Sequence, residues 1–179
     1  MENVEKTVWV LDPVHSELTF KVKHMMISNV KGHFKTFKVN VTGDDILKSV
    51  VTVAIDTTTI DTGSEQRDTH LKSADFFDVE NHPEMTFHST SIEQDDDDDE
   101  FVMKGMLTIK GISKEVELEV EFGGVNKDPW GNEKAGYSVE GKINRKDWGL
   151  NWNAALETGG LLVSDEVKIT GEIQFVKQS

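Results

Sequence analysis

Apolar and polar residues alternate along most of this chain, and this two-residue period constrains the fold more than any other feature. In the clearest stretch, Val116, Leu118, Val120 and Phe122 alternate with four glutamates. Successive side chains of a β-strand point to opposite faces, so this pattern indicates a strand with one apolar and one solvated face. With comparable stretches, and with the run 49–56, which is apolar on both faces and indicates a well-covered strand, we predict eight strands, at 17–23, 37–42, 49–56, 85–92, 101–109, 116–122, 137–143 and 167–175. We therefore predict an all-β chain.

Short turns with glycine, asparagine or aspartate join most of these stretches, which indicates sequential antiparallel hairpins. Eight strands in an up-and-down order can close into a β-barrel whose interior is filled by side chains or holds one small ligand. Gly105, Gly141 and Gly171 lie inside predicted strands and favour a barrel over the main alternative, a two-sheet sandwich. We expect one domain over residues 1–179, with its core at about 8–176.

Two segments break the alternation. Within 63–78 we predict one short helix, with Ser64 as its N-cap and an ion pair between Asp68 and Lys72 one turn apart. The other segment, 145–160, is a long connection with two tryptophans, and a connection of this length between tight hairpins is usually functional.

Charge and composition exclude several classes of partner. The 179 residues include 33 acidic and 19 basic side chains, and the net charge of −14 repels nucleic acid and anionic lipid surfaces. No apolar run reaches the roughly 18 residues of a membrane span, so we expect no stable membrane insertion. The chain has no cysteine, which excludes thiolate zinc sites and cysteine nucleophiles. The polar start predicts a cytoplasmic protein, or a periplasmic or secreted one if a signal was removed.

Five separated blocks follow a shared pattern. The first contains Asp12, His15, Ser16, Phe20, His24, Val30, Gly32, Phe34 and Phe37, and the others lie at 63–87, 105–111, 144–149 and 159–169. In order and spacing these blocks resemble the YceI-like, polyisoprenoid-binding family over roughly residues 8–175. The resemblance implies an eight-stranded lipocalin-like barrel without a cofactor. It also implies binding, without catalysis, of a long amphiphile such as a polyisoprenoid, an isoprenoid quinone or a fatty amide.

The candidate ligand-binding residues are side chains expected inside the barrel or at its mouth. They are Phe20, Val22, His24, Phe34, Phe37, Phe76, Phe77, Phe87, Met103, Leu107, Ile143, Trp148, Trp152 and Phe175. The alternation alone leaves open an interior packed solid with side chains. At the mouth, Phe76, Phe77, Trp148 and Trp152 line an opening or form a permanent plug.

The charged residues also leave alternatives open. Arg67 and Arg145 are the best pair for an anionic head group, but we favour a salt-bridge network that fastens the helix to the barrel. The acidic partners in that network would be Asp68, Asp75 or Asp147. His15 and His24 could meet across one strand, where we favour a structural hydrogen bond over contact with a ligand or metal. The acidic run 95–100 is expected to be a solvated hairpin tip.

The expected partner is a small hydrophobic ligand, and a homodimer is left open. Two other functions stay open. One is binding of a polar or metal-containing stress metabolite through pocket histidines. The other is hydrolysis or isomerisation in the same cavity, although the chain has no GxSxG motif and no glycine-rich phosphate loop.

Overall fold

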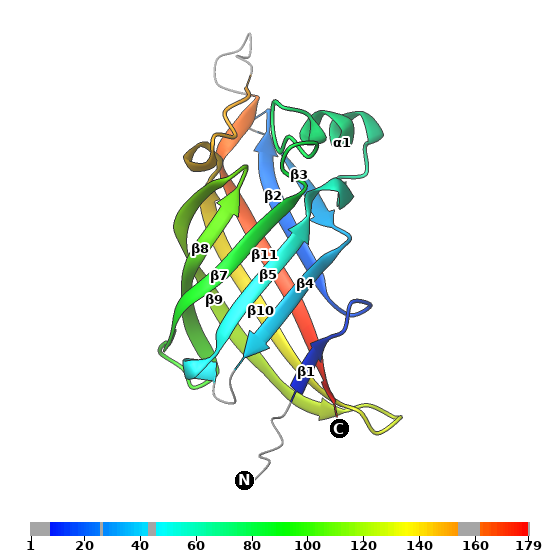
Figure 1. Cartoon of the computed structure of the whole chain (residues 1–179), viewed down its shortest axis with the longest axis vertical. Coiled ribbons are helices and arrows are strands. Elements are labelled where there is room, and N and C mark those ends of the chain that lie inside the picture. Colours follow the sequence, from blue (N-terminus) through cyan, green and yellow to red (C-terminus); the bar gives the residue numbers. More distant parts are fainter. Residues whose placement is uncertain (1–7, 26, 43–45, 154–161, 179) are drawn as a thin grey trace.

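A computed structural model describes residues 8–25, 27–42, 46–153 and 162–178. In this part of the chain, eleven strands form one antiparallel sheet, with α1 at one end and β1 beside the end of β11 at the other (Figure 1). The strands are β1 Val8–Leu11, β2 Glu17–His24, β3 Ser28–Phe34, β4 Phe37–Thr42, β5 Val50–Asp56, β6 Ile60–Asp61, β7 Glu84–Gln94, β8 Glu100–Ile109, β9 Ile112–Lys127, β10 Glu133–Asn144 and β11 Val163–Gln178. The helices are α1 Glu65–Lys72 and the 3-10 helices η1 Ile46–Lys48, η2 Thr57–Thr59 and η3 Arg145–Trp148. Within the described ranges, no helix is long and apolar enough to cross a membrane.

The sheet curls into a barrel because its strand order follows the chain and its two ends come together. The order is β4-β5-β7-β8-β9-β10-β11-β2-β3-β6, and β1 pairs with the end of β11 beyond its β2 partner. The two ends of this order, β4 and β3-β6, meet where β3 leads into β4 through Lys35 and Thr36. There the Lys35 amide donates to the Thr59 carbonyl at 3.3 Å, and the Asp56 amide donates to the Thr36 carbonyl at 3.0 Å.

The all-β antiparallel fold and the short helix are confirmed, but the predicted count of eight strands is wrong. The three missed strands are β1, β3 and β6. Strands β1 and β6 have four and two residues, too few to show a period. In β3, Gly32 occupies the buried position between Val30 and Phe34, so the apolar alternation is interrupted in the sequence.

Helix α1 begins where the sequence predicts. The Ser64 hydroxyl accepts a hydrogen bond from the Arg67 amide at 3.3 Å, which caps the helix. The predicted partner of Asp68 is wrong, because its Oδ1 accepts from the Thr62 amide at 2.8 Å and from the Thr62 hydroxyl at 2.5 Å. These contacts tie α1 to the segment that follows β6, not to Lys72.

The acidic run forms the β7–β8 turn, as predicted. The Asp95 amide donates to the Glu100 carbonyl at 2.8 Å, and the Glu100 amide donates to the Asp97 carbonyl at 3.1 Å. Repulsion, mainly from Asp97, raises the pKa of Glu100 above its usual value. The tip therefore concentrates negative charge outside the barrel.

A pH-dependent contact joins the β1–β2 loop to β10. Burial alone would raise the pKa of Asp12, but hydrogen bonds from His15 at 2.7 Å and Lys134 at 3.1 Å lower it from 3.8 to about 2. Because the folded-state pKa is lowered, this contribution to stability is complete above pH 3.8 and is lost as the pH falls toward 2. We expect Asp12→Asn to lower the free energy of unfolding near neutral pH by about 1 kcal/mol. Urea titrations at several pH values check this, and an equal loss at pH 2.5 and pH 7 would contradict it.

Candidate functional site

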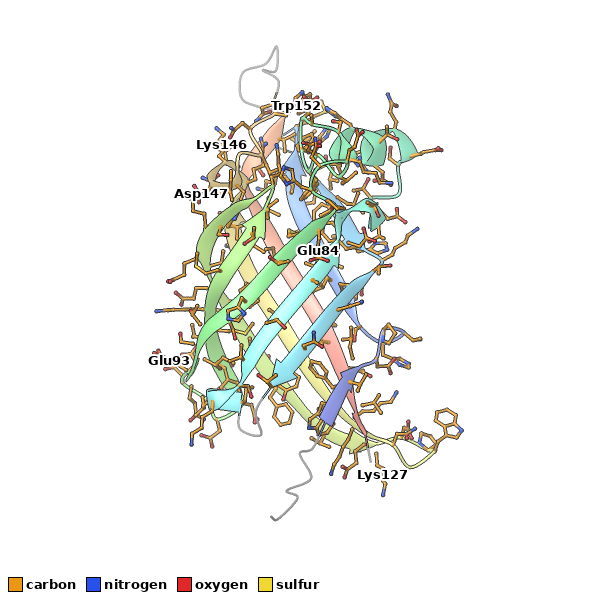
Figure 2. All side chains as sticks on the ribbon, in the orientation of Figure 1. Glu84, Glu93, Lys127, Lys146, Asp147 and Trp152 are labelled. Atoms are coloured by element: carbon orange, nitrogen blue, oxygen red, sulfur yellow. The ribbon has the colours of Figure 1, made fainter. Side chains whose placement is uncertain are left out.

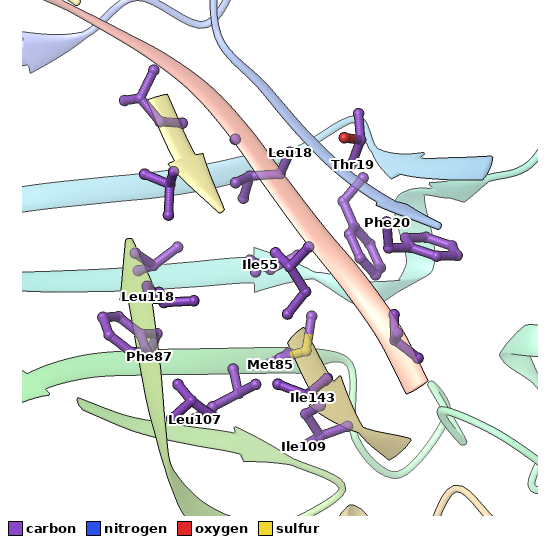
Figure 3. A pocket seen from close by; sticks show the side chains of 18 of the residues that line it. Leu18, Thr19, Phe20, Ile55, Met85, Phe87, Leu107, Ile109, Leu118 and Ile143 are labelled. Atoms are coloured by element: carbon purple, nitrogen blue, oxygen red, sulfur yellow. The ribbon is translucent and has the colours of Figure 1, made fainter. Parts of the chain in front are cut away.

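The barrel encloses a cavity of about 990 Å³. Apolar side chains from strands on all sides of the barrel point into the same space, as Phe20, Ile55, Phe87, Leu107 and Leu118 do in Figure 3. The volume lies at the upper end of the range of about 300–1,000 Å³ typical of small-molecule sites. The interior is therefore hollow, which excludes the alternative of a core packed solid with side chains.

Glycines in the wall help to keep the cavity open. An added Cβ at Gly32 would lie 2.4 Å from the ring of Phe20, and one at Gly105 would lie 2.5 Å from the ring of Phe87. Each ring therefore occupies the space that a side chain on the neighbouring strand would need. Because large residues lie beside glycines, the rings rest against the wall instead of meeting across the interior.

The cavity brings together most of the residues singled out in the sequence. Twelve of the fourteen line it: Phe20, Val22, His24, Phe34, Phe76, Phe77, Phe87, Met103, Leu107, Ile143, Trp152 and Phe175. Phe37 lies outside this lining, in a separate shallow groove beside Pro83 and Glu84. Trp148 also lies outside the lining: it is 2% exposed and its indole N–H donates to the Leu107 carbonyl at 2.8 Å. Trp148 is thus part of the wall and has no surface to offer a ligand.

Three aromatic rings form a cluster in the cavity wall beside α1. His70 contacts Trp152 with ring centroids 4.6 Å apart and Phe76 at 5.1 Å, and Phe76 contacts Trp152 at 5.5 Å. The imidazole Nε2 of His70 lies 2.9 Å from a carboxylate oxygen of Asp75. Sequence reasoning missed His70 as a lining residue, although its place on the only predicted helix was an available signal. The cluster joins α1 to the segment after η3, where Figure 2 shows Trp152.

Arg145 fastens the segments that form this end. Its guanidinium is buried and donates to the carbonyls of Ser164 and Trp152, both at 2.9 Å, and of Leu150 and Val163. Burial lowers the pKa of Arg145, and the charge of Asp165 at 4.0 Å opposes this shift. Arg145 therefore fastens the segments 150–152 and 163–164 to each other and does not fasten α1 to the barrel, and its nearest carboxylate is that of Asp165 instead of Asp68, Asp75 or Asp147.

Arg67 is held differently from Arg145. Its Nε donates to the Thr62 hydroxyl at 2.8 Å and one terminal nitrogen donates to the Thr62 carbonyl at 3.0 Å. The side chain lines the cavity beside α1. In the described part of the chain, it forms no ion pair with a carboxylate. The two arginines therefore do not act as one salt-bridge network.

The charges of the cavity are opposite to those of the whole chain. The described lining contains six basic side chains: Lys23, His24, Arg67, His70, Arg145 and Lys177. The same lining contains no aspartate or glutamate, although the chain has a net charge of −14. Acidic groups such as Glu93 and Asp147 project from the outer surface (Figure 2). Except for Lys177, these basic residues lie toward α1.

The predicted approach of His15 to His24 is wrong. His24 ends β2 beside α1, while His15 precedes β2 at the other end of that strand and pairs with Asp12. Nine residues of extended chain span roughly 30 Å. Among the described residues, no three histidine, aspartate or glutamate side chains are grouped as metal ligands.

Comparison with known proteins shows the relationship of this chain. Residues 9–175 match the family model described as a YceI-like domain. The chain belongs to the YceI-like family. This confirms the resemblance that the five sequence blocks indicate. A UPF0312 protein of Staphylococcus epidermidis is 42% identical over 172 residues, and the match covers 94% of this YceI-like chain and 97% of the relative.

Solved structures share the same fold. A Campylobacter jejuni YCEI protein is 34% identical, with a TM-score of 0.74 over 88% of this chain and 90% of that one. BcnA of Burkholderia cenocepacia is 23% identical, with a TM-score of 0.77 over 92% and 98% of the two chains. A polyisoprenoid binding domain from Saccharophagus degradans is 13% identical, with a TM-score of 0.66 over 97% and 100%. The last two comparisons establish the fold alone.

Proposed function

We propose that this YceI-like chain binds a long-chain amphiphile inside the barrel and catalyses no reaction. The ligand classes are a polyisoprenoid, an isoprenoid quinone and a fatty amide. The observation that carries the proposal is the cavity of about 990 Å³ with its apolar walls. The polyisoprenoid-binding description of the Saccharophagus degradans neighbour supports the same ligand class. We also propose that residues 8–176 act as one binding domain.

Apolar area supplies the affinity in this proposal. Burial of a few hundred Å² of alkyl chain at about 25 cal/mol per Å² provides several kcal/mol without polar contacts. Methylene groups are hard to tell apart in an apolar slot, so we expect loose selectivity for chain length. The wall offers few fixed hydrogen bonds along its length, which agrees with a chain and not with a polar metabolite.

The polar end of the ligand is proposed to lie beside α1. Lys23, His24, Arg67 and His70 line the cavity there. These groups donate hydrogen bonds or carry positive charge, so they favour a head group with acceptor oxygens. The remaining lining is mainly apolar and suits the chain.

The test is to identify what the protein carries and what it takes up. Protein purified without detergent is analysed by native mass spectrometry and organic extraction, and then titrated with the fluorescent fatty acid cis-parinaric acid in competition with geranylgeraniol. We expect a co-purifying prenyl or fatty species and competition between the two probes. Absence of both a carried lipid and probe binding would refute the proposal. A bound polar metabolite, or a metal lost in His24→Ala, would favour the histidine alternative.

A further inference from the structure

The end of the barrel farthest from α1 carries an exposed apolar projection. The β9–β10 hairpin extends there as residues 125–134, which we name the Trp130 tip. Trp130 is 83% exposed and Val125 is 53% exposed. An exposed tryptophan on a hairpin that carries a second exposed apolar side chain is typical of a surface that contacts another phase or molecule, because an indole has an apolar body with one polar N–H.

The turn holds Trp130 in a defined position. One carboxylate oxygen of Asp128 accepts from the amides of Trp130 and Asn132, both at 2.9 Å. The Gly131 amide donates to the Asp128 carbonyl at 3.0 Å, and Gly131 has a φ of 87°, which suits glycine. The indole is therefore presented to solvent by an ordered turn, so little conformational entropy is lost on contact.

The Trp130 tip has no net charge, whereas the chain as a whole is strongly negative. Residues 125–134 contain Lys127 and Lys134 against Asp128 and Glu133, so their formal charges cancel. Glu133 also lies 3.2 Å from Lys177. The chain as a whole has a charge of −14, which repels anionic surfaces, whereas the tip can approach a neutral surface without local repulsion.

The tip is continuous with the cavity. Val125 is exposed and at the same time lines the cavity, together with Trp9 of β1 and Lys177 of β11. Lys177 pairs with Trp9 across the sheet. The lining therefore reaches the outer surface at this end through Val125 and Lys177, and near α1 through Lys23 and Gln66.

We propose that the Trp130 tip docks on a neutral lipid bilayer and that the ligand passes between bilayer and cavity through this end. The route into the cavity rests on the proposed function. The head group of a bilayer amphiphile lies at the membrane surface, so it enters first and moves along the barrel toward Arg67 and His70. The chain follows and ends near Val125. This order brings the head group to the basic side chains that line the cavity beside α1.

The test uses the full chain and vesicles of phosphatidylcholine. Co-sedimentation measures docking, and transfer of cis-parinaric acid from vesicles to protein measures exchange. The variants are Trp130→Ser and, as a matched control at the α1 end, Ile27→Ser, since Ile27 is 87% exposed. We expect Trp130→Ser to reduce both vesicle binding and transfer about tenfold, which corresponds to losing roughly 60 Å² of buried apolar surface. Ile27→Ser is expected to leave both unchanged.

Separate outcomes distinguish this inference from the proposed function. All three proteins should bind cis-parinaric acid equally when it is supplied in solution. Wild-type protein that binds this probe but not vesicles overturns the docking, as does a Trp130→Ser variant that sediments like wild type. Wild-type protein that binds vesicles but no probe refutes the proposed function and the route into the cavity, while docking stands. A dimer that Trp130→Ser dissociates, without vesicle binding, assigns the tip to a contact between copies and overturns the proposal.

Discussion

Phe20→Asp is expected to weaken cis-parinaric acid binding at least about a hundredfold, because an ionised carboxylate in the apolar cavity must lose its hydration when a chain enters. Phe20 lines the cavity, and its ring centroid lies 5.7 Å from that of Phe34. The side chain is only partly buried, so the carboxylate retains access to water in the ligand-free protein. Titration of the purified variant with cis-parinaric acid, followed by the fluorescence of the probe, measures the loss of affinity.

The control for this variant is Lys21→Asp, which places the same carboxylate on the next residue of β2 but on the opposite face. It is expected to bind the probe as wild type does. Circular dichroism establishes that both variants are folded, and Phe20→Gln provides a neutral variant if the aspartate prevents folding. Wild-type affinity in folded Phe20→Asp would show that the ligand does not lie in the barrel.

Arg145→Met is expected to lower the free energy of unfolding by about 3–5 kcal/mol, because several backbone carbonyls lose their donor and each unsatisfied buried polar group costs about 1–3 kcal/mol. The guanidinium is 3% exposed and donates to four carbonyls in the segments 150–152 and 163–164. Methionine fills part of the volume but leaves those carbonyls without a donor. Urea denaturation followed by tryptophan fluorescence measures the change.

Lys146→Met is the matched control for the arginine. Lys146 is the next residue, is 44% exposed and lies 3.3 Å from Asp165. An exposed ion pair contributes little, so the expected change is within about 0.5 kcal/mol. Equal destabilisation by the two substitutions would show that the carbonyl contacts of Arg145 are not what stabilises this end of the barrel.

Local patterns were sufficient for most of the secondary structure. The two-residue period locates β2, β4 and β7 to β11, because alternation of side chains is a property of each strand by itself, and a continuous apolar run locates β5. The cap of α1 was also predictable, since Ser64 acts on an amide three residues away. The same reasoning failed where the signal was short or interrupted, as in β1, β6 and β3 with its Gly32.

Alternation, turns and charge were enough to predict an all-β antiparallel chain with an apolar inner face, a charged outer face and one helix. That the interior is a cavity, that Phe37 and Trp148 lie outside its lining, and that His70 belongs to it depends on how the strands pack in three dimensions. The same packing directs Arg145 to carbonyls and not to the predicted aspartates. Alternation along one strand determines which way a side chain points, whereas a cavity depends on the side chains that other strands bring to face it. Phe20 rests against Gly32 only because pairing of β2 with β3 brings the two residues together.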